Sequence, residues 1–265
     1  MPARRLHPFE VAAPIIGMVH LRPLPGSMYY EGSLDAVIDA ALADAWHLSN
    51  AGFDGLIVEN YGDIPFRKNR VEPHTVALMT AVTAEIVREI DLPIGINVLR
   101  NDPYAAVAVA SAVGARFIRV NVLAGVMVTD QGIIEGEAAE VVAYLDHVAP
   151  ELAIYADVDV KHARPLVARP LDELAVETAE RGGAHALIVT GSQTGVSIDH
   201  KELRAVRNAV AVPVVVGSGA SVESVGELVE ECDGVIVGSS IKVDGVSGNP
   251  VDPARAVAFV EAARG

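Results

Sequence analysis

The feature that most constrains the fold is an alternation that runs along the whole 265-residue chain. Short runs of β-branched and aliphatic residues alternate with longer segments of helical period, a pattern that indicates parallel β–α–β units. Eight such units predict an α/β fold of the closed (β/α)₈, or TIM-barrel, type, for which roughly 250 residues is typical. The expected strands are Ile15–His20, Gly55–Glu59, Pro93–Val98, Phe117–Asn121, Ala153–Val160, Ala186–Thr190, Pro213–Gly217 and Gly234–Gly238. The expected helices begin near Leu34, His74, Pro103, Glu137, Leu171, His200, Val222 and Pro253.

The chain is expected to form a single domain over residues 1–265, with residues 1–13 as an N-terminal extension before the first strand. A doubly wound open sheet is the alternative fold. It is disfavoured because the first strand is not followed by the Gly-x-Gly-x-x-Gly turn of dinucleotide-binding sheets. Ser33, Asp102 and Asp252 stand just before expected helices and are typical N-cap residues.

Charge and composition limit the kinds of partner that the chain can bind. The formal net charge is −15, and no basic stripe is present to neutralise the phosphates of nucleic acid or of anionic lipid. No uninterrupted apolar stretch of about 18 residues predicts a transmembrane helix, and the first ten residues do not resemble a signal peptide. The single cysteine, Cys232, fits a reducing compartment. We therefore expect a cytoplasmic protein without a nucleic-acid partner.

Long loops recur on one side of the expected barrel. The connections from helix to strand are two to four residues long, whereas several connections from strand to helix are much longer. In barrels these strand-to-helix loops build the functional face, so their length indicates a binding site there. Met127 lies in one of them and is expected to form a lid or a subunit interface. The long loops are Leu21–Gly32, Asn60–Pro73, Val122–Gly136, Gly191–Ile198 and Ser239–Val251.

The fifth expected strand carries the strongest candidates for catalysis. A strand period of two places Asp157, Asp159 and Lys161 on one face, and the apolar residues between them must then face the helices. Lys161 would contact a phosphate or a carbonyl group, and Asp157 or Asp159 would be a general acid–base or a metal ligand. The alternative is a structural ion cluster in which the three side chains satisfy one another.

Polar residues also end the other expected strands. Glu59 is a candidate general base or metal ligand, and His20 is either catalytic or a buried histidine with a structural role. A divalent metal, Mg²⁺ or Mn²⁺, would be held by Asp157, Asp159 and Glu59 if the site uses one. The expected substrate-binding residues are Arg22, Asn60, Asn97, Asn121, Thr190 and Gly191.

Two glycine-containing turns after the seventh and eighth strands predict a phosphate site. Glycine lets the backbone approach an anion closely, and amides at a helix start donate to it. Many barrels bind phosphate with these two loops. The alternative is that the glycines only make tight turns. Ser221 is expected to cap a helix that begins directly after the first turn. The predicted phosphate-binding residues are Gly217, Ser218, Gly219, Gly238, Ser239 and Ser240.

Five segments resemble the BtpA/SgcQ family, and the resemblance covers nearly the whole chain. The resemblance implies a barrel related to phosphate-binding barrels. In cyanobacteria the family is linked to the biogenesis or stability of photosystem I, with peripheral attachment to thylakoid membranes. Other members occur beside genes of sugar metabolism. In the family the position of Asp159 is variable, which ranks it below Asp157 and Lys161. The segments are Ile16–Gly26, Gly55–Phe66, Arg119–Gly132, Val160–Ala163 and Val189–Ser192.

Three functions follow from these observations. The first is an enzyme that acts on a phosphorylated sugar or related metabolite by isomerase, aldolase or lyase chemistry, and that we expect to form a homo-oligomer. The second is a non-catalytic factor for the biogenesis or stability of photosystem I or another membrane complex, which would need an exposed apolar patch. The third is a nucleotide hydrolase, although no Walker motif supports it.

Overall fold

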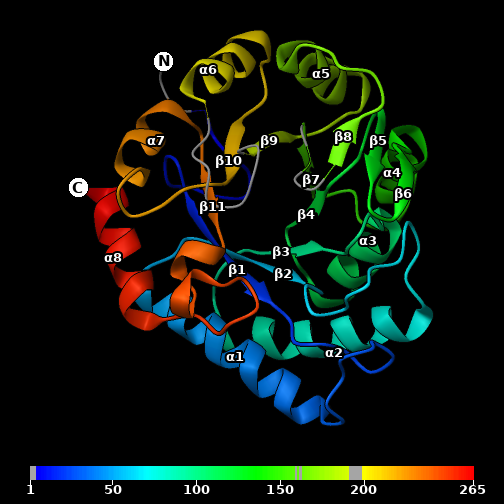
Figure 1. Ribbon diagram of the computed structural model, residues 1–265, viewed down its shortest axis with the longest axis vertical. Coiled ribbons are helices and arrows are strands. Elements are labelled where there is room, and N and C mark those ends of the chain that lie inside the picture. Colours follow the sequence, from blue (N-terminus) through cyan, green and yellow to red (C-terminus); the bar gives the residue numbers. More distant parts are fainter. Residues whose placement is uncertain (1–3, 159, 161–162, 191–198) are drawn as a thin grey trace.

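A computed structural model describes residues 4–158, 160, 163–190 and 199–265. In this part of the chain eight parallel strands close into a barrel in the order β1-β11-β10-β9-β7-β4-β3-β2, and the helices surround it as a ring (Figure 1). The predicted fold is therefore confirmed. The barrel strands are β1 (Ile15–His20), β2 (Gly55–Glu59), β3 (Ile94–Asn97), β4 (Phe117–Val120), β7 (Ala153–Asp157), β9 (Ala186–Thr190), β10 (Val214–Ser218) and β11 (Val235–Val237). The helices are α1 (Leu34–Ala51), α2 (Pro73–Glu89), α3 (Pro103–Val113), α4 (Ala138–Val148), α5 (Leu171–Val176), α6 (His200–Ala209), α7 (Val225–Glu231) and α8 (Pro253–Arg264).

The strand period of two divides the core into an inner and an outer part. In β1, Ile16 and Met18 point into the barrel, whereas Ile15 and Val19 pack against the helices. Aromatic rings fill the barrel interior, where Phe117 stacks on Tyr155 with 4.5 Å between ring centroids. Every second side chain of a barrel strand thus points into the barrel interior. Because the strands are parallel, the inward-facing residues at their last positions lie together at the carboxyl-terminal mouth.

The N-terminal extension closes the opposite end of the barrel. Leu6 and Phe9 are buried in the interior cluster, and the hydroxyl of Tyr155 donates a hydrogen bond to the carbonyl of His7. The backbone N–H of Arg4 donates to Asp233, just before β11, at 2.7 Å. These residues cover the amino-terminal end of the barrel, which we call the floor.

The predicted helix starts are confirmed at three positions and wrong at one. Ser33, Asp102 and Asp252 each accept a hydrogen bond from a backbone N–H in the first turn of the following helix. Ser221 does not cap a helix. Its N–H donates to the hydroxyl of Ser224 at 3.0 Å, which closes a turn first, and α7 begins only at Val225.

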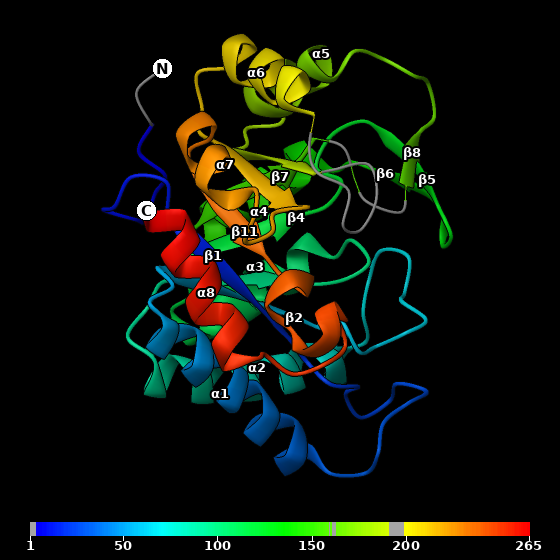
Figure 2. The same cartoon turned by 60° about the vertical axis from the view of Figure 1, so that its left-hand side comes forward.

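A small antiparallel sheet stands beside the barrel, near α4 (Figures 1 and 2). It consists of β5 (Val126–Thr129), β6 (Gly132–Glu135) and β8 (Ala163–Pro165) in the order β6-β5-β8. Met127 is buried inside this side sheet against Ile134 and Val160. Val160, which belongs to the same small core, also lines the cavity at the barrel mouth, and the expectation that Met127 forms a lid or a subunit interface stays a prediction.

The side sheet also corrects the fifth strand. β7 ends at Asp157, three residues earlier than expected, and Val160 joins the core of the side sheet. The predicted common face of Asp157, Asp159 and Lys161 stays a prediction. Asp159, Lys161 and Gly191 lie outside the described residues. Within the described residues, no helix is long and apolar enough to cross a membrane.

Candidate active site at the barrel mouth

The carboxyl ends of the strands surround a cavity of about 570 Å³. This volume is in the range of small-molecule and cofactor sites. One wall comes from the loops after β10 and β11, and the opposite wall comes from the ends of β2, β4 and β7 and the loops beside them. The residues that line the cavity and are used below are His20, Glu59, Tyr61, Phe66, Arg100, Arg119, Asn121, Asp157, Thr190, Gly217, Gly219, Ala220, Gly238, Ser239, Ser240 and Ser247.

His20 and Glu59 form a pair at the ends of neighbouring strands. β1 and β2 pair in register, with His20 opposite Glu59, and both side chains point inward. Nε2 of His20 lies 3.7 Å from Oε1 of Glu59, and Nδ1 of His20 is 2.8 Å from the carbonyl of Ser247. The His20 ring also stacks on Tyr61, with 4.5 Å between ring centroids. A histidine held on three sides in this way is pre-oriented for proton transfer.

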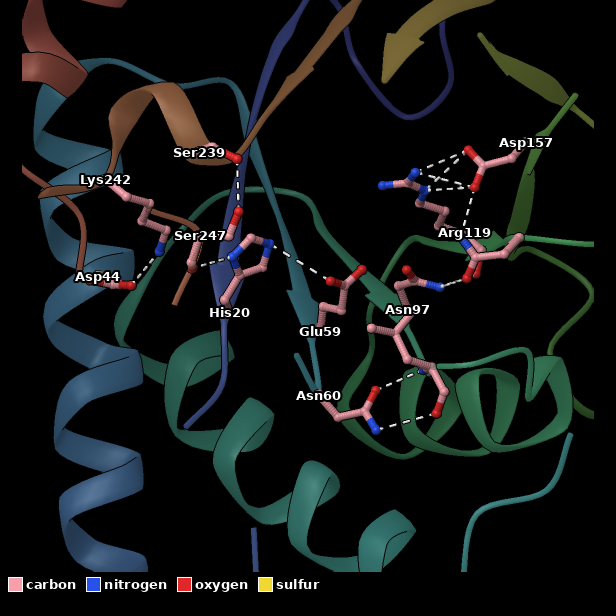
Figure 3. A network of polar contacts seen from close by, with 12 residues as sticks. His20, Asp44, Glu59, Asn60, Asn97, Arg119, Asp157, Ser239, Lys242 and Ser247 are labelled. Carbon is pink, nitrogen blue, oxygen red and sulfur yellow. Dashed lines mark hydrogen bonds and ion pairs between the residues drawn. The ribbon is translucent and has the colours of Figure 1, made fainter. Parts of the chain in front are cut away.

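A second polar network occupies the other side of the mouth (Figure 3). Nη2 of Arg119 lies 3.1 Å from both carboxylate oxygens of Asp157, and Nε lies 3.2 and 3.3 Å from them. Asn121 donates to Asp157 at 2.7 Å, and Asn97 donates to Asn121 at 3.2 Å. A carboxylate that already accepts a bidentate guanidinium and an amide is a structural anchor, so Asp157 orients Arg119 toward the cavity.

Burial changes the electrostatics of this network. Burial raises the pKa of the Asp157 carboxyl, while the charge and hydrogen bonds of Arg119 and the hydrogen bond of Asn121 lower it in part. Burial also lowers the pKa of Arg100, although Asp157 and Glu59 favour its charged form. Arginine stays protonated even so. The mouth therefore holds two guanidinium groups, from Arg100 and Arg119, at positions shielded from bulk water.

The two glycine turns line the cavity at the barrel mouth. Gly219 adopts φ +86°, a conformation that favours glycine. A short 3₁₀ helix, Ser239–Ile241, starts one residue after β11. The N–H groups of Ile241 and Lys242 donate to Gly238 and Ser239. The amides of Ser239 and Ser240 precede these bonds and have no acceptor within the helix, so they can donate to an anion.

Gly217 and Gly238 stand where a side chain would come too close to a neighbouring residue. A Cβ on Gly217 would lie 2.2 Å from Cγ2 of Ile188, and a Cβ on Gly238 would lie 3.3 Å from Cε1 of His20. Gly217 thus leaves room for Ile188 in the barrel interior, and Gly238 leaves room for the ring of His20. Gly238 thus links the glycine turn to the pair of His20 and Glu59.

The structure brings most of the predicted site residues into one cavity but not all of them. Asn60 holds the backbone of Leu99, accepting its N–H at 2.7 Å, and Asn97 lies beneath Asn121, so neither lines the mouth. The side chain of Arg22 is exposed and does not line it either. Ser218 ends β10. The predicted residues that do line the cavity are His20, Glu59, Asn121, Asp157, Thr190, Gly217, Gly219, Gly238, Ser239 and Ser240.

Several residues of the cavity wall were not among the predicted ones, including Arg100 and Arg119. Arg119 stands two positions before Asn121 and shares its inward face, so the strand period could have found it. Tyr61, Phe66 and Ser247 lie in loops, where no period signals which way a side chain points. The aromatic rings of Tyr61 and Phe66 give the cavity an apolar side.

The predicted metal ligands are Asp157, Asp159 and Glu59, of which Asp159 lies outside the described residues. The described residues contain no group of three or more His, Cys, Asp or Glu side chains arranged to hold an ion. Asp157 is already paired with Arg119, and a guanidinium at 3.1 Å repels a second cation.

Comparisons with known proteins agree with this architecture. The model of the BtpA family matches residues 11–265. The photosystem I biogenesis protein BtpA of Synechocystis is 47% identical over 255 residues, which cover 96% of this chain and 89% of that protein. The sgc region protein SgcQ of Escherichia coli is 31% identical over 261 residues and covers 93% and 92%.

Solved structures with the same fold are more distant in sequence. Thiamine phosphate pyrophosphorylase from Pyrococcus furiosus superposes with a TM-score of 0.57 at 16% identity, covering 95% of both chains. N-(5'-phosphoribosyl)anthranilate isomerase from the same organism superposes with a TM-score of 0.58 at 13% identity, covering 95% and 98%. At these identities the likeness concerns the fold.

Proposed function

The chain belongs to the BtpA family, and we propose that its barrel mouth binds a phosphorylated sugar or related metabolite and converts it by isomerase, aldolase or lyase chemistry. The observation that carries the proposal is that Gly219 and the 3₁₀ helix after β11 line the same cavity as His20 and Glu59, with Gly238 directly beside the His20 ring. Both solved structures compared above are named for phosphorylated compounds, and they share this fold.

The residues divide into two roles in this proposal. The amides of Ser239 and Ser240 and the turn at Gly219, which together we call the cradle, bind the phosphate group, as loops after the seventh and eighth strands do in many barrels. His20 and Glu59 transfer protons to and from the carbon skeleton beyond the phosphate. Arg119 and Arg100 stabilise negative charge that develops on oxygen, as in an enolate. Lys161 stays a predicted partner of the phosphate or carbonyl.

A thermal-shift titration with inorganic phosphate and with sugar phosphates tests the proposal. At one hundred times Kd, a ligand stabilises the folded state by about 2.7 kcal/mol, which for a chain of this size raises Tm by roughly 5–10 °C. Chloride at matched ionic strength is the control, because salt alone screens the repulsion in a chain of net charge −15.

Two variants locate the effect. Ser240→Asp places a carboxylate in the cradle and should abolish the phosphate-induced rise in Tm. Ser111→Asp makes the same change on the exposed end of α3 and should leave the rise intact. A rise that survives Ser240→Asp would place the anion elsewhere and contradict the proposed cradle.

A second candidate function is that of an assembly factor for a membrane complex, the role that the name of the Synechocystis relative states for that protein. It is favoured by an apolar patch on the side sheet, where Val128 and Ile133 are cross-strand neighbours and both are exposed. Leu166 and Val167 beside them are 57% and 69% exposed. Replacing Leu166 and Val167 by serine should weaken the binding of such a partner and should leave the rise in Tm with phosphate unchanged.

A further inference from the structure

His20 has a hydrogen-bond partner that fixes the position of its proton. Its Nδ1 lies 2.8 Å from the backbone carbonyl of Ser247, and a carbonyl can only accept. Nδ1 must therefore carry the hydrogen, and in the neutral ring Nε2 carries the lone pair. Nε2 is the nitrogen that faces Glu59, so the base points toward the cavity.

The hydroxyl of Ser247 makes a second contact, and it leads to the phosphate cradle. Ser247 Oγ lies 2.7 Å from the hydroxyl of Ser239, the first residue of the 3₁₀ helix (Figure 3). Two hydrogen bonds thus connect the cradle to the histidine in the order Ser239, Ser247, His20.

The segment that contains Ser247 is held at both ends by one buried carboxylate. Asp44 of α1 pairs with the Nζ of Lys242 at 2.6 Å and accepts the backbone N–H of Val251 at 2.7 Å. Lys242 and Asp44 are almost completely buried. We call residues 242–251 the strap. Because its ends are fixed, a small shift at Ser239 is transmitted through Ser247 rather than lost in a loose loop.

We propose that Ser247 is a positioning residue that holds His20 in its Nδ1–H tautomer, and that the hydroxyl bond from Ser239 couples this state to an anion bound in the cradle. This inference rests on the proposed function for the anion, whereas the tautomer itself does not depend on it. The outcome would be a base that is set for proton transfer when the phosphate end of the ligand is in place.

Nitrogen NMR of the histidine rings tests the proposal directly. Long-range ¹H–¹⁵N spectra of the ¹⁵N-labelled full chain, recorded over a pH series up to the point where the ring signals no longer change, distinguish the two neutral tautomers. The His20 signals are assigned by their loss in His20→Gln. We expect the Nδ1–H form in the unaltered protein. A neutral imidazole in water can carry the hydrogen on either nitrogen, so the tautomer reports on the surroundings of the ring. Adding inorganic phosphate should shift both the His20 ring nitrogens and the amides of Ser239 and Ser240.

Removing either hydroxyl breaks the link between the cradle and His20 but leaves the backbone carbonyl of Ser247 in place. Ser247→Ala and Ser239→Ala should therefore each keep the Nδ1–H tautomer and lose most of the phosphate-induced shift of the His20 ring nitrogens, while the amides of residues 239 and 240 still shift. Ser247→Thr keeps a hydroxyl and should restore the His20 shift. Thr80→Ala is the control, because the Thr80 hydroxyl donates to the carbonyl of Val76 at 2.8 Å within α2, and it should change neither the tautomer nor the shift. Melting temperatures confirm that each variant is folded.

The outcomes separate this inference from the proposed function. An Nε2–H tautomer in the unaltered protein would overturn the role of Ser247. Phosphate that shifts the Ser239 and Ser240 amides but not the His20 ring, or an undiminished His20 shift in both Ser239→Ala and Ser247→Ala, would overturn the coupling. Phosphate that shifts none of these signals would refute the cradle, while the tautomer of the unaltered protein would still test Ser247.

Discussion

The pair of Arg119 and Asp157 is where a single substitution should cost most. The Asp157 side chain is 1% exposed and the Arg119 side chain 11%, so each charge depends on the other for compensation. Arg119→Met removes the guanidinium that is hydrogen-bonded to the buried carboxylate and should lower the free energy of unfolding by about 3–5 kcal/mol in a urea titration. Adding Asp157→Asn removes the stranded charge and should recover much of that loss. Equal stability of the single and the double variant would contradict this account.

Cys232 should make the folded state sensitive to alkaline pH. Burial raises the pKa of its thiol from 9.0 to about 11, and its sulfur contacts the carbonyl of Gly234 at 3.1 Å. A group whose pKa is raised by folding contributes stability below its unfolded pKa and loses it as pH rises toward its folded pKa. The stabilising contribution of Cys232 is therefore full below about pH 9 and disappears by about pH 11.

Comparison with Cys232→Ala isolates that contribution, because all other groups titrate in both proteins. The difference in free energy of unfolding between the two should be constant up to about pH 9 and should shrink by about 2–3 kcal/mol by pH 11, at about 1.36 kcal/mol for each pH unit. Urea titrations across this range measure it. A difference that stays flat would mean that the thiol ionises as easily in the folded chain as in the unfolded one.

The sequence identifies site residues where a strand period decides their direction. Glu59 and Asp157 follow buried strands, and their inward direction follows from the apolar residues on either side. Arg119 obeys the same rule, but it stands inside an apolar run and is easily taken for a surface residue. Ser247 could not be predicted, because its role depends on a loop conformation that is fixed by Asp44, about 200 positions away in the sequence.

At the scale of elements, Asp44 determines the position of the strap. Asp44→Ala leaves the Lys242 ammonium buried without a partner and frees the N–H of Val251, and it should lower the free energy of unfolding by about 3–5 kcal/mol. Hydrogen exchange should quicken at the amides of residues 243–250. Asp39→Ala, on the exposed face of the same helix, is the control and should change stability by less than about 0.5 kcal/mol. Unchanged exchange in the Asp44 variant would show that other contacts fix the strap.

The order of the elements could be predicted from the sequence, but some of their ends could not. Eight periodic units separated by short turns leave few alternatives to a barrel. The end of β7 was misplaced because Val158 and Val160 continue the apolar alternation, whereas the chain turns there to place Ala163 opposite Thr129 in the side sheet. Strands of three or four residues, paired across loops, have too few residues to show a period.

For the whole molecule, the two ends of the barrel have different tasks. The floor is apolar and closed by Leu6 and Phe9, whereas the mouth gathers the charged and polar side chains. Barrels in general keep function at the carboxyl-terminal face and stability at the opposite face. We expect the same in this chain, so that substitutions in the floor change stability and substitutions at the mouth change ligand binding.

The last prediction separates stability from binding along the barrel axis. Phe9→Ala removes a ring from the floor and should lower the free energy of unfolding by about 3–5 kcal/mol. The rise in Tm that phosphate induces should persist, because the cradle at Gly219 and Ser239 lies at the other end. Ser240→Asp should show the reverse, a smaller loss of stability without ligand, from the lost hydrogen bond to Ala220, and no rise in Tm with phosphate. Loss of the phosphate effect in Phe9→Ala would mean that the floor and the mouth are coupled through the aromatic stack of Phe117 and Tyr155, and that the barrel responds as one unit to a change at either end.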